Sequence, residues 1–145
     1  MKALLQRVSS AKVEVAGRVV GEIDQGLLVL VGIEPQDGTE QLQKMLKKML
    51  NYRVFADEQG RMNLSVKDIQ GGVLLVSQFT LAADTGSGLR PGFSTAAAPE
   101  QAERLFAELV TMAKAAHAHI ETGEFGANMQ VSLTNDGPVT FLLEV

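Results

Sequence analysis

Residues 26–33 read Gly-Leu-Leu-Val-Leu-Val-Gly-Ile, a continuous apolar run with a glycine near each end. An apolar run this short favours a β-strand that is buried on both faces. The hydrophobic period then changes to that of an amphipathic helix, with apolar residues at Leu42, Met45, Leu46, Met49 and Leu50. Asp37, with Glu40 three residues later, resembles a capping box and predicts Asp37 as the N-cap of this helix. A buried strand followed by an amphipathic helix indicates an α/β fold.

The residues before this run are typical of paired strands. A strand begins at Leu4–Val8 and continues through Ala11, Val13 and Val15, which alternate with polar residues. Ala16-Gly17 is a two-residue turn signal and predicts a return strand over residues 18–22.

Past the first helix, Tyr52–Ala56 and Arg61–Val66 resemble a hairpin joined by a four-residue turn. Val73–Phe79 is a mostly apolar run that predicts another buried strand. Residues 82–98 are rich in small residues and contain a proline, so they indicate a long loop. Loops of this length inside a compact domain are usually functional or mobile.

Pro99 fits the first position of a second helix. The apolar face of that helix is marked by Ala102, Leu105, Phe106, Leu109, Met112, Ala113 and Ala116. Two further strands, Met129–Leu133 and Val139–Val145, follow and are joined by a turn. We therefore expect a single α/β domain over residues 1–145, with mixed β-sheet layers and two main helices packed on one side.

The composition excludes several kinds of chemistry. The 145 residues include no cysteine, so disulfides, thiolate catalysis and Cys-ligated metals are excluded. With only two histidines, His117 and His119, one chain cannot build a three-His metal site. We expect no metal and no cofactor.

The charge and hydropathy of the chain limit its partners and its location. The net charge is −4, so a nucleic acid must be held by a local patch or recognised at one end. No apolar stretch approaches the roughly 20 residues that span a bilayer, and the N-terminus does not resemble a signal peptide. We expect a soluble cytoplasmic protein with no membrane partner.

Ser77-Gln78-Phe79-Thr80-Leu81 lies where the Val73–Phe79 strand runs into the loop. A nucleophile elbow is excluded, because Leu75 and Phe79 occupy the places where G-x-S-x-G requires glycine. Spacing alone favours hydroxyls that cap local backbone groups. The alternative is functional: the last N–H groups of the strand point into a cleft and form an oxyanion hole.

Two places offer phosphate contacts. Lys44, Lys47 and Lys48 fall on the side of the first helix opposite its leucines, which is more often a solvated face. Arg90 in the long loop is the second candidate, although it also fits an ordinary turn.

The segment Asn135-Asp136-Gly137-Pro138-Val139-Thr140 combines a hairpin signal with a proline. Proline cannot donate a ladder hydrogen bond, and a cis Gly-Pro bond suits a tight reversal. The segment is either an ordinary turn or a rigid tip that displays bare carbonyl oxygens.

These two segments, in this order, resemble the signature motifs of the D-aminoacyl-tRNA deacylases, also called D-tyrosyl-tRNA deacylases. The resemblance extends over essentially the whole chain and includes Met1–Val8, Gly26–Gly32, Arg53-Val54-Phe55, Arg90-Pro91-Gly92-Phe93 and Phe125-Gly126. It implies the deacylase fold and a homodimer that hydrolyses the ester between a D-amino acid, or glycine, and the 3′-terminal adenosine of tRNA. It also implies a cis Gly-Pro turn that enters the active site of the other subunit.

Mapped onto this chain, the resemblance implies catalytic roles for Ser77, Gln78, Phe79 and Thr80. It implies that the carbonyls of Gly137 and Pro138 receive the substrate's α-amino group, so that an L side chain collides with the turn. Arg7, Leu81 and Asn135 complete the substrate-binding set, with Arg7 expected to brace the turn.

The Thr80 hydroxyl is either a nucleophile or a group that orients water. No activating base for it is evident, so we favour attack assisted by the 2′-hydroxyl of the tRNA. Two other classes of protein stay open on the residues alone: a non-catalytic dimeric binding module, and a small-molecule esterase that uses Thr80.

Overall fold

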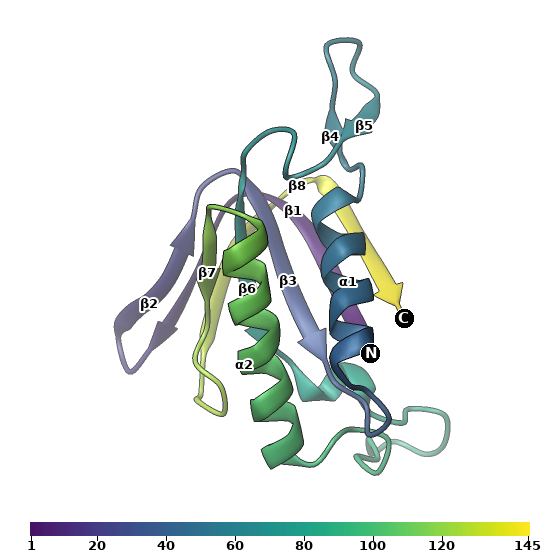
Figure 1. Cartoon of the computed structure of the whole chain (residues 1–145). Helices are drawn as coiled ribbons and strands as arrows, with labels where there is room; N and C mark the ends of the chain where they lie inside the picture. Colours follow the sequence, from purple (N-terminus) through teal and green to yellow (C-terminus); the bar gives the residue numbers. More distant parts are fainter.

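A computed structural model describes residues 1–145 as one mixed sheet, a small separate hairpin and two long helices (Figure 1). The elements are β1 (Lys2–Val15), β2 (Arg18–Ile23), β3 (Gly26–Gly32), α1 (Thr39–Asn51), β4 (Phe55–Ala56), β5 (Met62–Leu64), β6 (Gly72–Ser77), the 3₁₀ helix η1 (Phe79–Ala82), α2 (Pro99–Ala116), β7 (Ile120–Thr122) and β8 (Gln130–Glu144). The mixed α/β class with two helices on one side is confirmed. No helix of the chain has the length and apolar character to cross a membrane.

The sheet has the strand order β2-β1-β3-β6-β7. Along one edge of β1, β3 pairs with its first half and β2 with its second half, whereas β8 pairs with nearly the whole of the opposite edge. The β3–β6 and β6–β7 pairs are parallel, whereas β1 is antiparallel to each of its three partners. The sheet curls until β2 meets β7: a Cβ on Gly21 would lie 2.3 Å from the Thr122 carbonyl oxygen. Glycine at position 21 permits this approach and leaves the sheet nearly closed.

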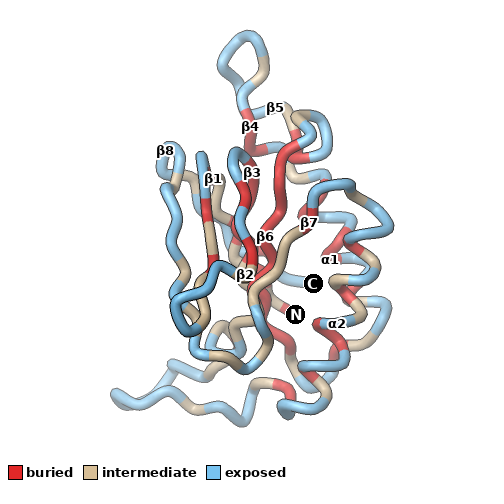
Figure 2. Tube along the Cα trace, turned by 90° about the vertical axis from the view of Figure 1, so that its left-hand side faces the viewer, coloured by how far each residue is buried: buried red, intermediate tan, exposed pale blue.

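Two apolar clusters lie on the two faces of the curled sheet. The larger cluster joins Ala3, Leu5 and the β3 and β6 residues of that face to the apolar faces of α1 and α2. The smaller cluster lies on the inner side of the curl and includes Val8, Val13 and Val76. Figure 2 shows the buried residues concentrated along the central strands, while the β4–β5 tip and the loop after η1 are exposed. β1 contributes to both clusters, and its register with β8 shifts on either side of Val8.

The two helices have the predicted apolar faces. All five predicted residues of α1 are buried, and so are five of the seven predicted for α2, while Met112 is half-buried and Ala116 exposed. Pro99 is the first residue of α2, as expected. The β1–β2 turn at Ala16-Gly17 and the β4–β5 hairpin are also confirmed.

The predicted N-cap of α1 is wrong by one residue. Gly38 is the N-cap, and its N–H donates to Gln41 Oε1 at 2.9 Å. The Asp37 carboxylate is buried and accepts hydrogen bonds from the Met1 ammonium, at 3.0 Å, and from the Glu34 N–H, at 2.7 Å. Met1 is also fully buried and pairs with Glu34. The Asp37 carboxylate therefore forms a long-range ion pair with the Met1 ammonium instead of capping α1.

The closing strands are not a hairpin. Leu133 pairs with Ala11 and Thr140 pairs with Gln6, so both halves of β8 run along the same neighbour, β1. Residues 136–139 are extra residues between the Asn135–Val8 and Thr140–Gln6 pairs, and they bulge out as a turn. The expected reversal of the chain is therefore wrong. The predicted strand Val73–Phe79 also ends earlier, at Ser77, because η1 begins at Phe79.

Candidate active site

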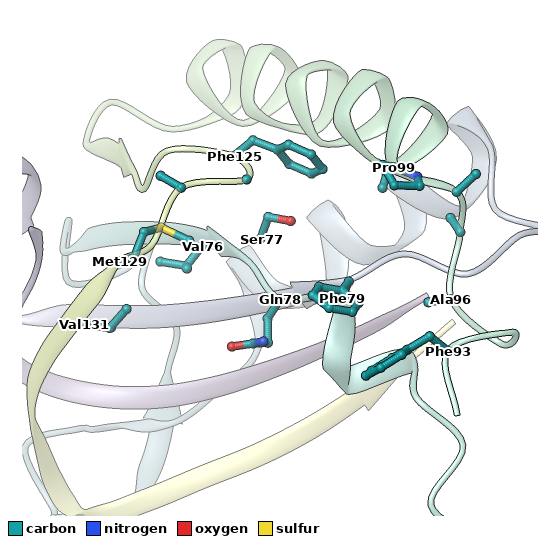
Figure 3. Close-up of a pocket in the computed structure, with 15 residues that line it drawn as sticks. Val76, Ser77, Gln78, Phe79, Phe93, Ala96, Pro99, Phe125, Met129 and Val131 are labelled. Carbon is teal, nitrogen blue, oxygen red and sulfur yellow. The ribbon is translucent and has the colours of Figure 1, made fainter. Parts of the chain in front are cut away.

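A cavity of about 620 Å³ opens where β6 ends (Figure 3). Its walls come from the end of β6 and the start of η1, from the residues leading into α2, and from the segment between β7 and β8. Eleven of its fifteen lining residues are hydrophobic, so it suits an apolar or aromatic group more than a charged one. Ser77 and Gln78 are the polar side chains at its floor.

Ser77 is held by its strand. It pairs with Val31 of β3, and the next N–H, of Gln78, donates to the Val31 carbonyl at 2.8 Å. In Figure 3 the Ser77 hydroxyl points into the space between Phe125 and Phe79. Because the strand fixes its backbone, Ser77 is positioned to donate a hydrogen bond to a ligand in the cavity.

The N–H groups of Phe79 and Thr80 begin the helix η1, which follows β6 directly. The first N–H groups of a helix have no intrahelical partner and favour negative charge. Gly32 of β3 lets η1 approach the sheet, since a Cβ there would lie 2.9 Å from the Cβ of Leu81. Leu81 thus packs on β3 and does not line the cavity. The local fold presents backbone donors at the end of a strand, which is what an oxyanion requires.

Thr80 has a partner that cannot activate it. The side-chain amide of Gln78 donates to Thr80 Oγ at 2.5 Å, and an amide does not take up a proton. Thr80 is exposed and lies outside the set of residues that line the cavity. A nucleophilic hydroxyl normally needs an adjacent base, so this geometry favours a positioning role.

The turn at residues 136–139 is braced from β1. Arg7 donates to the Asp136 carbonyl at 3.0 Å and to the Val54 carbonyl at 2.7 Å, so the expected contact between Arg7 and the turn is present. The amide of Asn135 donates to the Arg7 and Val139 carbonyls, at 2.9 and 3.0 Å. The Gly137-Pro138 peptide is cis, as expected.

Glycine is required at position 137 for two reasons. Its φ of +130° is disfavoured for other residues, and a Cβ would lie 2.8 Å from Val139 Cγ2 and 3.0 Å from Arg7 Nη2.

The structure does not bring the two motifs together in one chain. Ser77 pairs with Val31 of β3, and Val31 pairs with Ala3 of β1, so Ser77 lies level with Ala3. Arg7 is four residues further along β1, a separation of about 13 Å at roughly 3.3 Å per residue. From the other side, Val131 of the cavity lies six residues before Gly137, about 20 Å. Figure 1 shows the bend of β8 (yellow) beside β4 and β5, and the loop that follows η1 at the opposite end.

The predicted phosphate contacts are exposed but do not line the cavity. Lys44 is paired with Glu40, which lowers the pKa of the Glu40 carboxyl through a hydrogen bond and charge attraction. Lys48 donates to the Glu144 carbonyl at 3.4 Å. Lys47 and Arg90 have no carboxylate within 4.0 Å.

Apart from Phe79, the apolar walls of the cavity were not identified from the sequence as site residues. Phe79 and Phe93 pack with their rings tilted by 54° and their centroids 5.2 Å apart, and Phe125 closes the opposite side (Figure 3). Met129 and Val131, at the start of β8, complete the set. A usable signal was the run of small residues before Pro99, because small side chains leave space beside the N-terminus of a helix.

Backbone donors beside an apolar cavity, with no activated nucleophile, are suited to the hydrolysis of an already reactive ester. A family model described as D-Tyr-tRNA(Tyr) deacylase matches residues 4–144. The D-aminoacyl-tRNA deacylases of Ectopseudomonas mendocina and of Pseudomonas putida strain F1 are 68% and 66% identical to the chain, each over 100% of both sequences.

Two solved structures have the same fold. One, described as "c-Myc DNA Unwinding Element Binding Protein", is 42% identical, with a TM-score of 0.96 over 100% of this chain and 99% of that one. The other, described as a probable eukaryotic D-amino acid tRNA deacylase, is 15% identical, with a TM-score of 0.82 over 99% and 98%. The chain belongs to the D-Tyr-tRNA(Tyr) deacylase family. It is a D-aminoacyl-tRNA deacylase, a hydrolase that acts on ester bonds.

Proposed function

We propose that residues 1–145 act as a single catalytic domain that releases D-amino acids, and glycine, from tRNA, and that they reject L-amino acids by steric exclusion. The proposed enzyme is a homodimer in which Gly137 and Pro138 of one subunit enter the cavity of the other. Aminoacyl-tRNA is the substrate of translation, so we place this activity in the cytoplasm.

The observation that carries the proposal is the separation of the two motifs. Ser77–Leu81 and the Gly137-Pro138 turn lie at opposite ends of one chain, so they can share a substrate only if a second copy supplies one of them. The outer edge of β8 is unpaired and exposes Leu133, Phe141 and Leu142. An unpaired strand edge with exposed apolar side chains favours association with a second chain.

In the proposed reaction, water attacks the ester carbonyl with assistance from the tRNA 2′-hydroxyl. The N–H groups of Phe79 and Thr80 stabilise the oxyanion that forms. The bond to the 3′-oxygen then breaks, that oxygen takes up a proton, and the free amino acid leaves. Ser77 and Gln78 orient the substrate and the Thr80 hydroxyl.

Chiral selection follows from where the amino group is held. The carbonyl oxygens of the partner's Gly137 and Pro138 accept hydrogen bonds from the substrate ammonium. An L side chain would then point at the turn, whereas a D side chain or the hydrogen of glycine would point away. Because Arg7 and Asn135 both hold the turn, the turn cannot move aside to admit the L substrate.

The test measures the release of amino acid from D-, L- and glycyl-tRNA and from a simple D-amino acid ethyl ester. We expect release from the D and glycyl forms only. Equal release from the L form would refute steric exclusion. Release from the ethyl ester at a similar rate would indicate a small-molecule esterase, and no release from any substrate would indicate a binding module.

A further inference from the structure

The basic residues of this acidic chain are not evenly distributed. Residues 44–68 hold six of the thirteen Lys and Arg residues but three of the seventeen Asp and Glu residues. That segment has a net charge of +3, which leaves −7 for the remainder of the chain. The segment covers the second half of α1 and the β4–β5 hairpin, and Figure 1 shows both at one end of the molecule.

Four cations of this segment are exposed, have no carboxylate within 4.0 Å and donate no side-chain hydrogen bond: Lys47, Arg53, Arg61 and Lys67, here called the hairpin-end basic patch. Lys48 also lacks a carboxylate but donates to the Glu144 carbonyl. Two neighbouring carboxylates are occupied by backbone and side-chain donors of their own turns. Asp57 accepts from the N–H groups of Gln59 and Arg61, and Asp68 accepts from the N–H and hydroxyl of Ser65. Glu58 at the hairpin tip is the remaining acid of residues 44–68, and Asp136 of the neighbouring turn is paired with Arg7.

The patch lies beside the Gly137-Pro138 turn. Arg7 links the two, since it donates to the carbonyl of Val54, the neighbour of Arg53, and to the carbonyl of Asp136 in the turn. Arg7 therefore connects the backbone beside Arg53 to the turn.

The cavity end of the same chain lacks such a surface. Residues 84–104, which lead from the loop after η1 into α2, carry Arg90 and Arg104 against Asp84, Glu100 and Glu103. Their net charge is −1, so phosphate groups gain little from this end.

We propose that the hairpin-end basic patch of one subunit binds the phosphates of the tRNA whose aminoacyl end occupies the cavity of the other subunit. This inference rests on the proposed function, because the turn that enters the partner's cavity brings the patch to its entrance. Each active site then takes its chemistry from one chain, and its chiral gate and RNA contacts from the other.

The first test compares kcat/KM for D-aminoacyl-tRNA with kcat/KM for the D-aminoacyl ester of a short oligoribonucleotide that ends in adenosine. Arg53→Gln with Lys67→Gln should lower the ratio of the two values about tenfold. It should also reduce the slope of log kcat/KM for tRNA against log salt concentration by roughly 0.7–0.9 per lost phosphate contact. The matched control, Arg18→Gln with Lys114→Gln, removes two exposed cations without a carboxylate within 4.0 Å, one at the start of β2 and one in α2, and should leave the ratio unchanged.

Arg61→Glu places the opposite charge at the exposed hairpin tip, where the core is not disturbed, and should lower the same ratio. An unchanged ratio and salt slope in both patch variants would refute the inference while leaving the proposed function intact. Wild-type enzyme that hydrolyses neither substrate would instead refute the proposed function.

The second test decides between the two subunits. A heterodimer is assembled from one chain with Phe79→Pro, which disables its cavity, and one chain with Arg53→Gln and Lys67→Gln. The working cavity then belongs to the chain whose patch is altered, and the native patch belongs to the chain whose cavity is disabled. If the patch acts across the interface, the ratio should return to the wild-type value. A ratio as low as that of the patch-variant homodimer would overturn the assignment to the partner subunit.

Discussion

Replacing Phe79 with proline removes one backbone donor from the proposed oxyanion hole. Proline lacks an N–H but fits the first position of a helix, and Phe79 is the first residue of η1. A proline disfavours the helical conformation in the residue before it, and Gln78, with φ −142° and ψ 84°, is not helical. The substitution therefore deletes a donor without forcing Gln78 out of a helical conformation.

The matched control is Phe79→Ala, which removes the ring but keeps the N–H. The ring is 53% exposed and its main aromatic partner is Phe93, so both variants should remain folded. Loss of a single oxyanion donor costs about 10²–10³ in kcat, or roughly 2.7–4 kcal/mol. We expect the proline variant to fall below the alanine variant by that factor.

The assay is single-turnover hydrolysis of D-aminoacyl-tRNA at saturating enzyme, with thermal unfolding measured in parallel. Saturating enzyme removes the contribution of substrate binding, so the rate reports the chemical step. Equal rates for the proline and alanine variants, at equal stability, would show that the Phe79 N–H does not bind the oxyanion.

Three further predictions concern the groups around the site. Thr80→Val should reduce kcat less than about tenfold, because the hydroxyl accepts from an amide and has no base; an acyl-enzyme trapped at Thr80 by mass spectrometry would contradict this. Arg7→Met should raise the rate on L-aminoacyl-tRNA relative to D, because the hydrogen bond to the Asp136 carbonyl and the ion pair with the Asp136 carboxylate, which hold the turn, are both lost; unchanged D-over-L selectivity would argue against the brace. Hydrogen bonds from Asn63 and the backbone lower the pKa of Asp57, so its stabilisation of the β4–β5 hairpin is present above the usual carboxyl pKa and is lost as the pH falls through the lower, folded-state value. Hydrogen exchange of the hairpin amides should accelerate, relative to Asp57→Asn, only across that acidic range.

Local sequence patterns predicted correctly the strands and helices that have an uninterrupted apolar run or apolar face. The apolar run at residues 26–33 and the two helix faces needed no knowledge of their partners, because period and length already distinguish strand from helix. The failures depend on distant residues. Asp37 is withdrawn from the helix cap by the Met1 ammonium, and the segment at Asn135–Thr140 resembles a hairpin because nothing local shows that both flanks pair with β1.

The candidate site divides in the same way. Ser77–Leu81 and Gly137-Pro138 were identified through short polar motifs that resemble a known family. The apolar walls were missed, since Phe125, Met129 and Val131 carry no chemical signature and become a site only when the curled sheet brings them to Ser77. Whether the two motifs meet across subunits depends on a second chain, which no pattern within one chain encodes.

The pairing of β1 with β8 has a consequence for how the protein forms during synthesis. Lys2 pairs with Glu144 and Glu14 with Gln130, so one edge of β1 has no partner until residues 130–144 have left the ribosome. Contacts between such distant residues require closure of a very long loop, which slows folding. Until β8 docks, β1 is an open strand edge that other nascent chains can bind. The sheet can therefore be completed only after residues 130–144 have been synthesised, and the same step creates the turn on which the proposed chiral selection depends.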